Sequence, residues 1–136
     1  MRIWRCLCSA GQLIEKVLRQ VSLASDRRKM PSELSGGMRK RAGLARALVL
    51  EPKILLADEP SSGLDRITAA EIDELLLEQK SEHNTTVIVV THDVHGVRRV
   101  GDRFAVFDKG DLIAFGSAAE VEESEHETAR KLISEN

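Results

Sequence analysis

The stretch KILLADEPSSGLD, residues 53–65, decides the fold of this chain. Its apolar run from Ile54 to Ala57 is too short for a helix and is bounded by Pro52 and Pro60. Such a run predicts a strand that is buried on both faces of a parallel sheet. The expected fold class is therefore α/β, with a mostly parallel sheet flanked by helices.

Two carboxylates, Asp58 and Glu59, follow this strand directly. Ligands of open α/β sheets bind outside the carboxyl ends of the strands. Adjacent carboxylates are costly to bury unless a cation or a proton-transfer task compensates for them. We therefore expect Asp58 to help hold Mg²⁺ and Glu59 to polarise a water that attacks a phosphate. Taken alone, the stretch is equally compatible with an acidic surface turn before Pro60.

A second informative stretch, LSGGMRKR, lies upstream at residues 34–41. Gly36 and Gly37 allow the backbone to approach an oxyanion, because neither has a Cβ. The helix predicted over residues 38–50 would point its N-terminal amides at that anion. An isolated Ser-Gly-Gly is more often only a helix cap and hinge. The basic run at residues 39–41 is expected to be a solvated face without a catalytic role.

Together the two stretches resemble the nucleotide-binding subunits of ABC transporters. Residues 34–38 resemble the signature loop, with methionine where the family usually has glutamine, and residues 54–59 resemble the Walker B motif. Residues 61–65 look like the D-loop and residues 89–93 like the switch-histidine loop. The order and spacing of the four motifs favour this interpretation. It implies a partial P-loop NTPase fold.

The resemblance also implies a site for ATP and Mg²⁺. Glu59 and His92 would be catalytic, although a lone histidine after a strand usually only caps it, and Asp58 would bind Mg²⁺. The residues expected to contact nucleotide are Ser35, Gly36, Gly37, Met38 and Asp65. Two partners are implied: a second ATPase subunit in a head-to-tail dimer, and a transmembrane permease.

The sequence contains no Gly-Lys-Ser or Gly-Lys-Thr, the part of the phosphate loop that cradles ATP in this family. We therefore expect residues 12–136 to be the C-terminal part of an ABC ATPase domain, and residues 1–11 to be an unassigned N-terminal segment. The chain alone is expected to be inactive.

Hydrophobic periodicity predicts the remaining elements. Amphipathic helices are expected over residues 12–21 and 67–79, and a second buried strand over residues 85–91. Residues 104–107 and 112–115 flank a Lys-Gly turn, which predicts a β-hairpin. The composition of residues 118–133 is helical.

Composition excludes several classes of protein. The net charge is −2 over 136 residues, which argues against a nucleic-acid partner. No apolar run is long enough to span a membrane. Cys6 and Cys8 lack a second pair of metal ligands, and their spacing disfavours a disulfide, so a reducing cytoplasm is the default. The resemblance implies a peripheral position on the cytoplasmic face of the inner membrane.

Within the family, the sequence most resembles ATPases of the lipid-asymmetry and solvent-tolerance type (Mla-type). The resemblance rests on residues 31–41, 63–68 and 91–99, and it implies transport of a phospholipid or another hydrophobic solute. Arg66 departs from the proline that most of those ATPases have. Two alternatives remain: a soluble ABC-type ATPase not involved in transport, and a non-catalytic fragment that acts only as a binding module.

Overall fold

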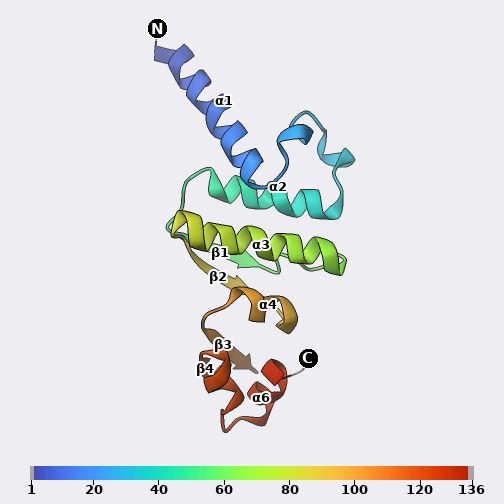
Figure 1. The fold of residues 1–136 in the computed structure, drawn as a ribbon, viewed down its shortest axis with the longest axis vertical. Helices are drawn as coiled ribbons and strands as arrows, with labels where there is room; N and C mark the ends of the chain where they lie inside the picture. The colour runs from blue at the N-terminus through green and yellow to red at the C-terminus, as the bar shows by residue number, and fades with distance from the viewer. Residues whose placement is uncertain (1, 135–136) are drawn as a thin grey trace. The chain divides into compact units, whose positions relative to one another are not determined.

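The computed structural model describes residues 2–134, with side chains described from Ala10 onward except that of residue 95. Figure 1 shows the order of the elements along the chain. The chain divides into two compact units, residues 1–90 and 91–136. The side chains of Cys6 and Cys8 lie outside the described part, so the inference drawn from them stays a prediction. Among the described residues, no helix is both long enough and apolar enough to cross a membrane.

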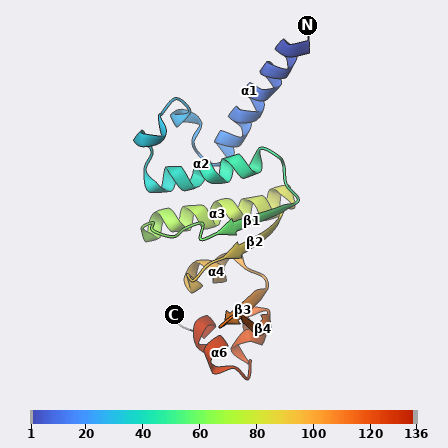
Figure 2. The same cartoon turned by 180° about the vertical axis from the view of Figure 1, so that it is seen from behind.

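Three helices and two strands make up the first unit: α1 (Arg2–Gln20), α2 (Gly36–Leu48), β1 (Ile54–Asp58), α3 (Arg66–His83) and β2 (Thr86–Val90). Two short 3-10 turns, Ala24–Asp26 and Pro31–Glu33, join α1 to α2. Helices α2 and α3 lie side by side, as both views show (Figures 1 and 2). Both helices carry small and aliphatic side chains that are almost fully buried, among them Ala45 and Leu48 of α2 and Ile72 and Leu76 of α3.

The two strands of the first unit pair in parallel, from Ile54 opposite Thr86 to Asp58 opposite Val90. Parallel neighbours need a crossover connection, and α3 supplies it. The pairing continues one residue past the strand, because the Glu59 N–H donates to the Val90 carbonyl at 2.8 Å. The predicted parallel strand pair is therefore confirmed.

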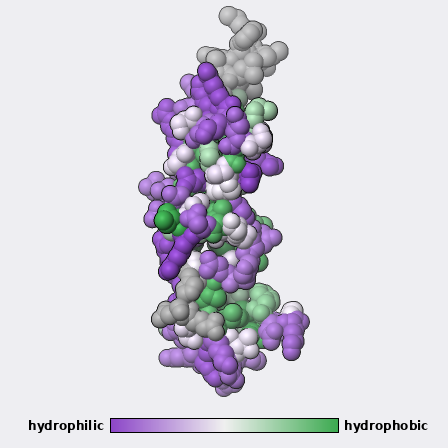
Figure 3. Space-filling view, turned by 90° about the vertical axis from the view of Figure 1, so that its right-hand side faces the viewer, coloured by the Kyte–Doolittle hydropathy of each residue, from purple (hydrophilic) through white to green (hydrophobic). Residues whose placement is uncertain are grey.

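The prediction that these strands are buried on both faces is wrong. Successive side chains of a strand point to opposite faces of the sheet. On the face toward α3, Leu55 is 4% exposed, whereas on the other face Leu56 is 73% and Val90 62% exposed. Ile54 and Ile88 share this open face. No element in the described part of the first unit covers it. In one side view of the molecule, Figure 3 shows apolar patches that lie between polar areas of the surface.

The predicted helices exist, with shifted ends. The helix expected from residue 12 begins at Arg2, inside the segment that was left unassigned. The helix expected from residue 67 runs from Arg66 to His83 and is closed by Asn84 in the left-handed conformation, φ 51°. Short polar residues adopt this conformation more readily than most, and it commonly ends helices.

The second unit contains α4 (Val94–Val100), β3 (Phe104–Asp108), β4 (Asp111–Gly116), α5 (Ala118–Glu122) and α6 (Glu127–Ser134). Strands β3 and β4 pair antiparallel, which confirms the hairpin. Its turn residues, Lys109 and Gly110, both have positive φ, as a two-residue hairpin turn requires. The helical segment expected over residues 118–133 is divided into two helices. The core of the second unit consists of Phe104, Val106, Val121, Ala129 and Ile133.

Candidate functional site

The first unit places two carboxylates at the carboxyl end of β1. Asp58 is exposed and Glu59 is half-buried. Asp58 is exposed because its side chain lies on the open face of the sheet, as that of Leu56 does. Glu59 lies in the left-handed region, with φ 45°. Residues other than glycine rarely adopt this conformation, and it persists only where the surroundings hold it.

Hydrogen bonds hold the Glu59 backbone on both sides. Its N–H donates to the Val90 carbonyl at 2.8 Å, and its carbonyl accepts from the Ser62 N–H at 3.3 Å. The same carbonyl also accepts from Lys40 Nζ at 2.7 Å. The conformation of the turn that carries the carboxylate is thus fixed by two strands and a helix.

The signature-like residues form the first turn of α2. Ser35 caps the helix, and its Oγ accepts from the Met38 N–H at 3.2 Å. The Met38 amide is therefore occupied within the helix itself. Ser35 and Gly36 are exposed, so this end of the helix faces solvent. A helix N-terminus of this kind attracts anions through its free amides and its dipole.

Gly37 differs from Gly36 because it is buried. A Cβ on Gly37 would lie 2.4 Å from Cγ2 of Thr68 on α3. At Gly36 the nearest atom, Cδ2 of Leu64, would lie at 3.4 Å, an ordinary contact. Close packing of α2 on α3 thus requires the second glycine. The sequence pattern predicts only a role at the anion for Gly37.

Asp65 is the N-cap of α3. Its Oδ1 accepts from the Ile67 and Thr68 amides, both at 3.1 Å, and its Oδ2 accepts from the Thr68 hydroxyl at 2.6 Å. These bonds, the hydroxyl first, lower the pKa of Asp65 below its ordinary value. Both carboxylate oxygens are thus used inside the helix. Aspartate immediately before the start of a helical apolar pattern is a helix-start signal that would have indicated this cap.

The basic run after the signature is not simply a solvated face. The Arg41 side chain is 17% exposed and forms an ion pair with Glu71 of α3. Lys40 reaches from α2 to the turn after β1, where it bonds the Glu59 carbonyl and approaches Ser62 Oγ at 3.4 Å. The sequence does not predict these contacts, because a run of basic residues looks the same whether its side chains are solvated or paired with residues far away in the chain.

The expected site residues divide between the two units. In the first unit, contacts among α2, α3 and the intervening turn bring Ser35, Gly36, Gly37, Glu59 and Asp65 together. His92 is separated from the end of β2 by Thr91, is exposed, and belongs to the second unit.

Asp58 and Glu59 could bind Mg²⁺ only together with oxygen atoms of waters or of a bound phosphate. Among the described residues, no group of three or more histidine, cysteine, aspartate or glutamate side chains could hold a metal ion. Mg²⁺ is commonly bound by one or two carboxylates together with waters and substrate phosphates. The exposed Asp58 fits such a site, and the ion would supply charge neutralisation at the phosphates.

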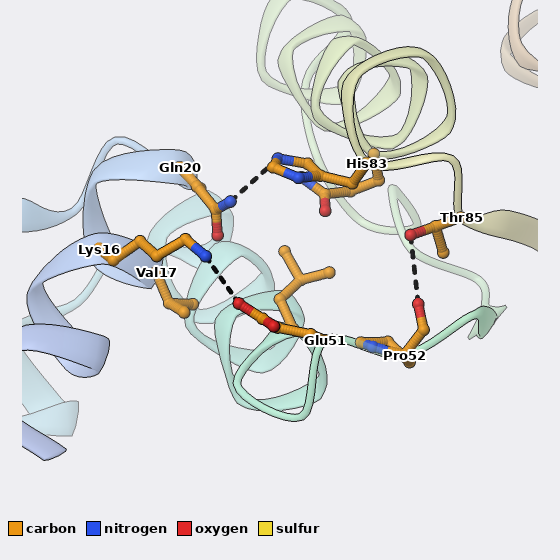
Figure 4. A pocket seen from close by; sticks show the side chains of 9 residues that line it. Lys16, Val17, Gln20, Glu51, Pro52, His83 and Thr85 are labelled. Atoms are coloured by element: carbon orange, nitrogen blue, oxygen red, sulfur yellow. Dashed lines mark hydrogen bonds and ion pairs between the residues drawn. The ribbon is translucent and has the colours of Figure 1, made fainter. Parts of the chain in front are cut away.

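A cavity of about 320 Å³ lies at the opposite end of the first unit, where the strands begin and α2 and α3 end. Figure 4 shows the Lys16–Glu51 ion pair, at 2.6 Å, and the Gln20–His83 hydrogen bond, at 3.0 Å, at its wall. Thr85 Oγ1 donates to the Pro52 carbonyl at 3.2 Å. The cavity includes none of the expected site residues.

Comparisons with known proteins agree with this fold. A family model described as "ABC transporter" matches residues 6–62. The chain is 40% identical over 121 residues to the "Probable ribonucleotide transport ATP-binding protein mkl" of Mycobacterium leprae, covering 89% of this chain and 35% of that protein. It is 41% identical over 124 residues to "Methionine import ATP-binding protein MetN 1" of Pseudomonas putida, covering 90% of this chain and 37% of that protein.

A solved structure supports the same class. It is the dimeric post-hydrolysis state of the ATP-binding cassette MJ0796 bound to ADP and Pi, with a TM-score of 0.66 and 35% identity. The match covers 75% of this chain and 44% of that chain. The fold is that of part of an ABC ATPase domain, and the sequence is similar to those of ABC transporter ATP-binding proteins. It spans about a third of the length of the curated relatives it matches.

Proposed function

We propose that this chain contributes the signature and Walker B parts of the ATP-hydrolysing subunit of an ABC transporter. The observation that carries this proposal is the arrangement in the first unit. There Lys40, on the helix capped by Ser35, directly bonds the turn that carries Glu59. An anion-attracting helix end and a carboxylate thus belong to one connected assembly. The ADP- and Pi-bound relative supports a nucleotide as the ligand.

In this proposal each residue has a separate task. Glu59 accepts a proton from the water that attacks the γ-phosphate. Asp58 holds Mg²⁺ through its exposed carboxylate, and His92 contacts the γ-phosphate. The exposed end of α2 at Ser35 and Gly36 meets ATP held by a second ATPase subunit in a head-to-tail dimer. The phosphate cradle comes from a Gly-x-x-x-x-Gly-Lys-Ser/Thr segment, which this sequence does not contain.

The remaining proposals concern the complete transporter. A permease subunit would receive the energy of hydrolysis, which puts the ATPase on the cytoplasmic face of the inner membrane. A phospholipid or another hydrophobic solute is the cargo that the signature-like and switch-like residues favour. The relatives named for ribonucleotide transport and methionine import make small polar solutes the competing choice.

A second candidate function, a non-catalytic binding module, has one observation in its favour. The sequence contains no Gly-Lys-Ser or Gly-Lys-Thr. Such a module would use the same surfaces to bind an ATPase or a permease without hydrolysing ATP.

Glu59→Gln tests the proposed hydrolysis. The variant is made in a protein completed with the phosphate-loop segment of a related ATPase. General-base catalysis is worth about 10²- to 10⁴-fold in rate, so turnover should fall by that factor. ATP affinity should stay unchanged and the ATP-bound dimer should accumulate, because binding rests on the phosphate loop and Mg²⁺. Steady-state turnover, nucleotide titration and dimer mass measure the three quantities.

Two further variants complete this test. Asp58→Asn should weaken the Mg²⁺-dependent part of ATP binding. Glu78→Gln, an exposed glutamate on α3, is the matched control and should hydrolyse ATP normally. A Glu59→Gln enzyme whose turnover stays within about tenfold of the parent rate contradicts the role of Glu59.

A further inference from the structure

We propose that Lys40 is a positioning residue that holds the Glu59 turn and ties it to the signature helix. This inference rests on the proposed function, because it assigns Lys40 a task at the same site. Lys40 lies in α2, close to the cap at Ser35, and its Nζ is 2.7 Å from the Glu59 carbonyl. A hydrogen bond donated by an ammonium group is roughly twice as strong as a neutral one.

The Glu59 turn needs such a tether because its backbone is unfavourable by itself. Glu59 has φ 45°, and left-handed backbone at a residue other than glycine is unfavourable unless the surrounding structure holds it. Within the turn the Glu59 carbonyl accepts the long Ser62 N–H bond of 3.3 Å. The shorter bond from Lys40 is therefore the stronger of the two that hold this carbonyl.

The hydrogen bond from Lys40 also fixes the direction in which the Glu59 side chain leaves the backbone. The Glu59 N–H is attached to β2 at Val90 and its carbonyl to α2 at Lys40. With both ends of the residue held, its Cα–Cβ bond has a set direction relative to the sheet and to the helix. A displacement of the signature helix would therefore move the carboxylate, which gives Lys40 a role that a solvated lysine lacks.

Hydrogen exchange in the 136-residue chain tests the tether without requiring activity. Lys40→Met keeps an unbranched side chain as far as the Cε position and removes the ammonium donor. The Ser62 and Leu64 amides, which bond the Glu59 and Ser61 carbonyls, should exchange about tenfold faster. Amides of α3 should keep their rates. Lys40→Arg should restore most of the protection. Lys53→Met, an exposed lysine before β1, is the control and should change nothing.

Turnover in the completed protein tests the consequence. Lys40→Met should lower kcat by about 10- to 100-fold, as small displacements of catalytic groups do, and leave the KM for ATP unchanged. Unchanged exchange at Ser62 and Leu64 overturns the proposal. Equally faster exchange throughout α3 also overturns it, because Lys40 would then act on general stability. If the completed parent hydrolyses no ATP, the proposed function fails, whereas the exchange result still decides whether Lys40 holds the turn.

Discussion

Gly37 illustrates how one residue can serve packing and an expected binding role at once. The signature pattern explains a glycine here by the approach of a phosphate, and the structure adds the approach of Thr68. Thr68 has little freedom to turn away, because its hydroxyl bonds the Asp65 carboxylate at 2.6 Å. The cap of α3 and the packing of α2 are thus coupled through one threonine.

Gly37→Ala should therefore lower the free energy of unfolding by about 1–3 kcal/mol, the usual cost of overpacking a close contact. The cause is the 2.4 Å approach of the new Cβ to Thr68. Gly43→Ala in the same helix is the control. Nothing lies within 4 Å of a Cβ there, so the variant should gain about 0.5–1 kcal/mol.

Denaturant unfolding of the parent and both variants measures these differences. Combining Gly37→Ala with Thr68→Ser removes the clashing methyl group and keeps the hydroxyl, so stability should partly recover. Equal stability of Gly37→Ala and Gly43→Ala would show that the close approach does not govern this position.

At the scale of elements, the β1–β2 pair presents two unsatisfied surfaces. One is the apolar face formed by Ile54, Leu56, Ile88 and Val90. The other consists of the two outer strand edges, since within the described residues β1 and β2 pair only with each other. Unpaired edges and apolar patches are sites at which other chains add.

The isolated chain should therefore self-associate. Leu56→Lys combined with Ile88→Lys should reduce that association, because it places charges on the open face of the sheet. Ile67→Lys changes an exposed isoleucine, 77% accessible, outside this face and should leave association unchanged. Sedimentation velocity and light scattering follow the species present. A monodisperse parent with a cooperative thermal transition is the contrary result.

At the scale of the whole molecule, the proposed function has the site residues act on the metal, the attacking water and the nucleotide of a second subunit. The sequence contains no Gly-Lys-Ser or Gly-Lys-Thr, the part of the phosphate loop that cradles the phosphates of ATP in P-loop ATPases. We expect the chain to bind Mg-ATP weakly or not at all. Isothermal titration calorimetry of the 136-residue chain measures this, with the completed protein as the positive control. A dissociation constant in the low micromolar range would be incompatible with this expectation.

The sequence by itself determined the class of fold, the parallel strand pair, the hairpin and the approximate helices. Those features follow from local patterns, because apolar spacing, prolines and turn glycines act on neighbours in the chain. It also indicated Asp58, Glu59 and the Ser35 cap as candidates. These residues lie at the ends of a strand or a helix. Their place in the sequence therefore already indicates where they lie in the fold.

Only the tertiary structure decided which surfaces are covered and which side chains meet. A strand buried on both faces and a strand with one open face can have the same apolar sequence. The exposure of Leu56 is therefore known only from the structure, in which α3 packs on one face of the sheet. The bond from Lys40 to Glu59 and the contact of Gly37 with Thr68 join residues far apart in sequence. Such contacts depend on how helices and strands are placed in space, and local pattern carries no information about that placement.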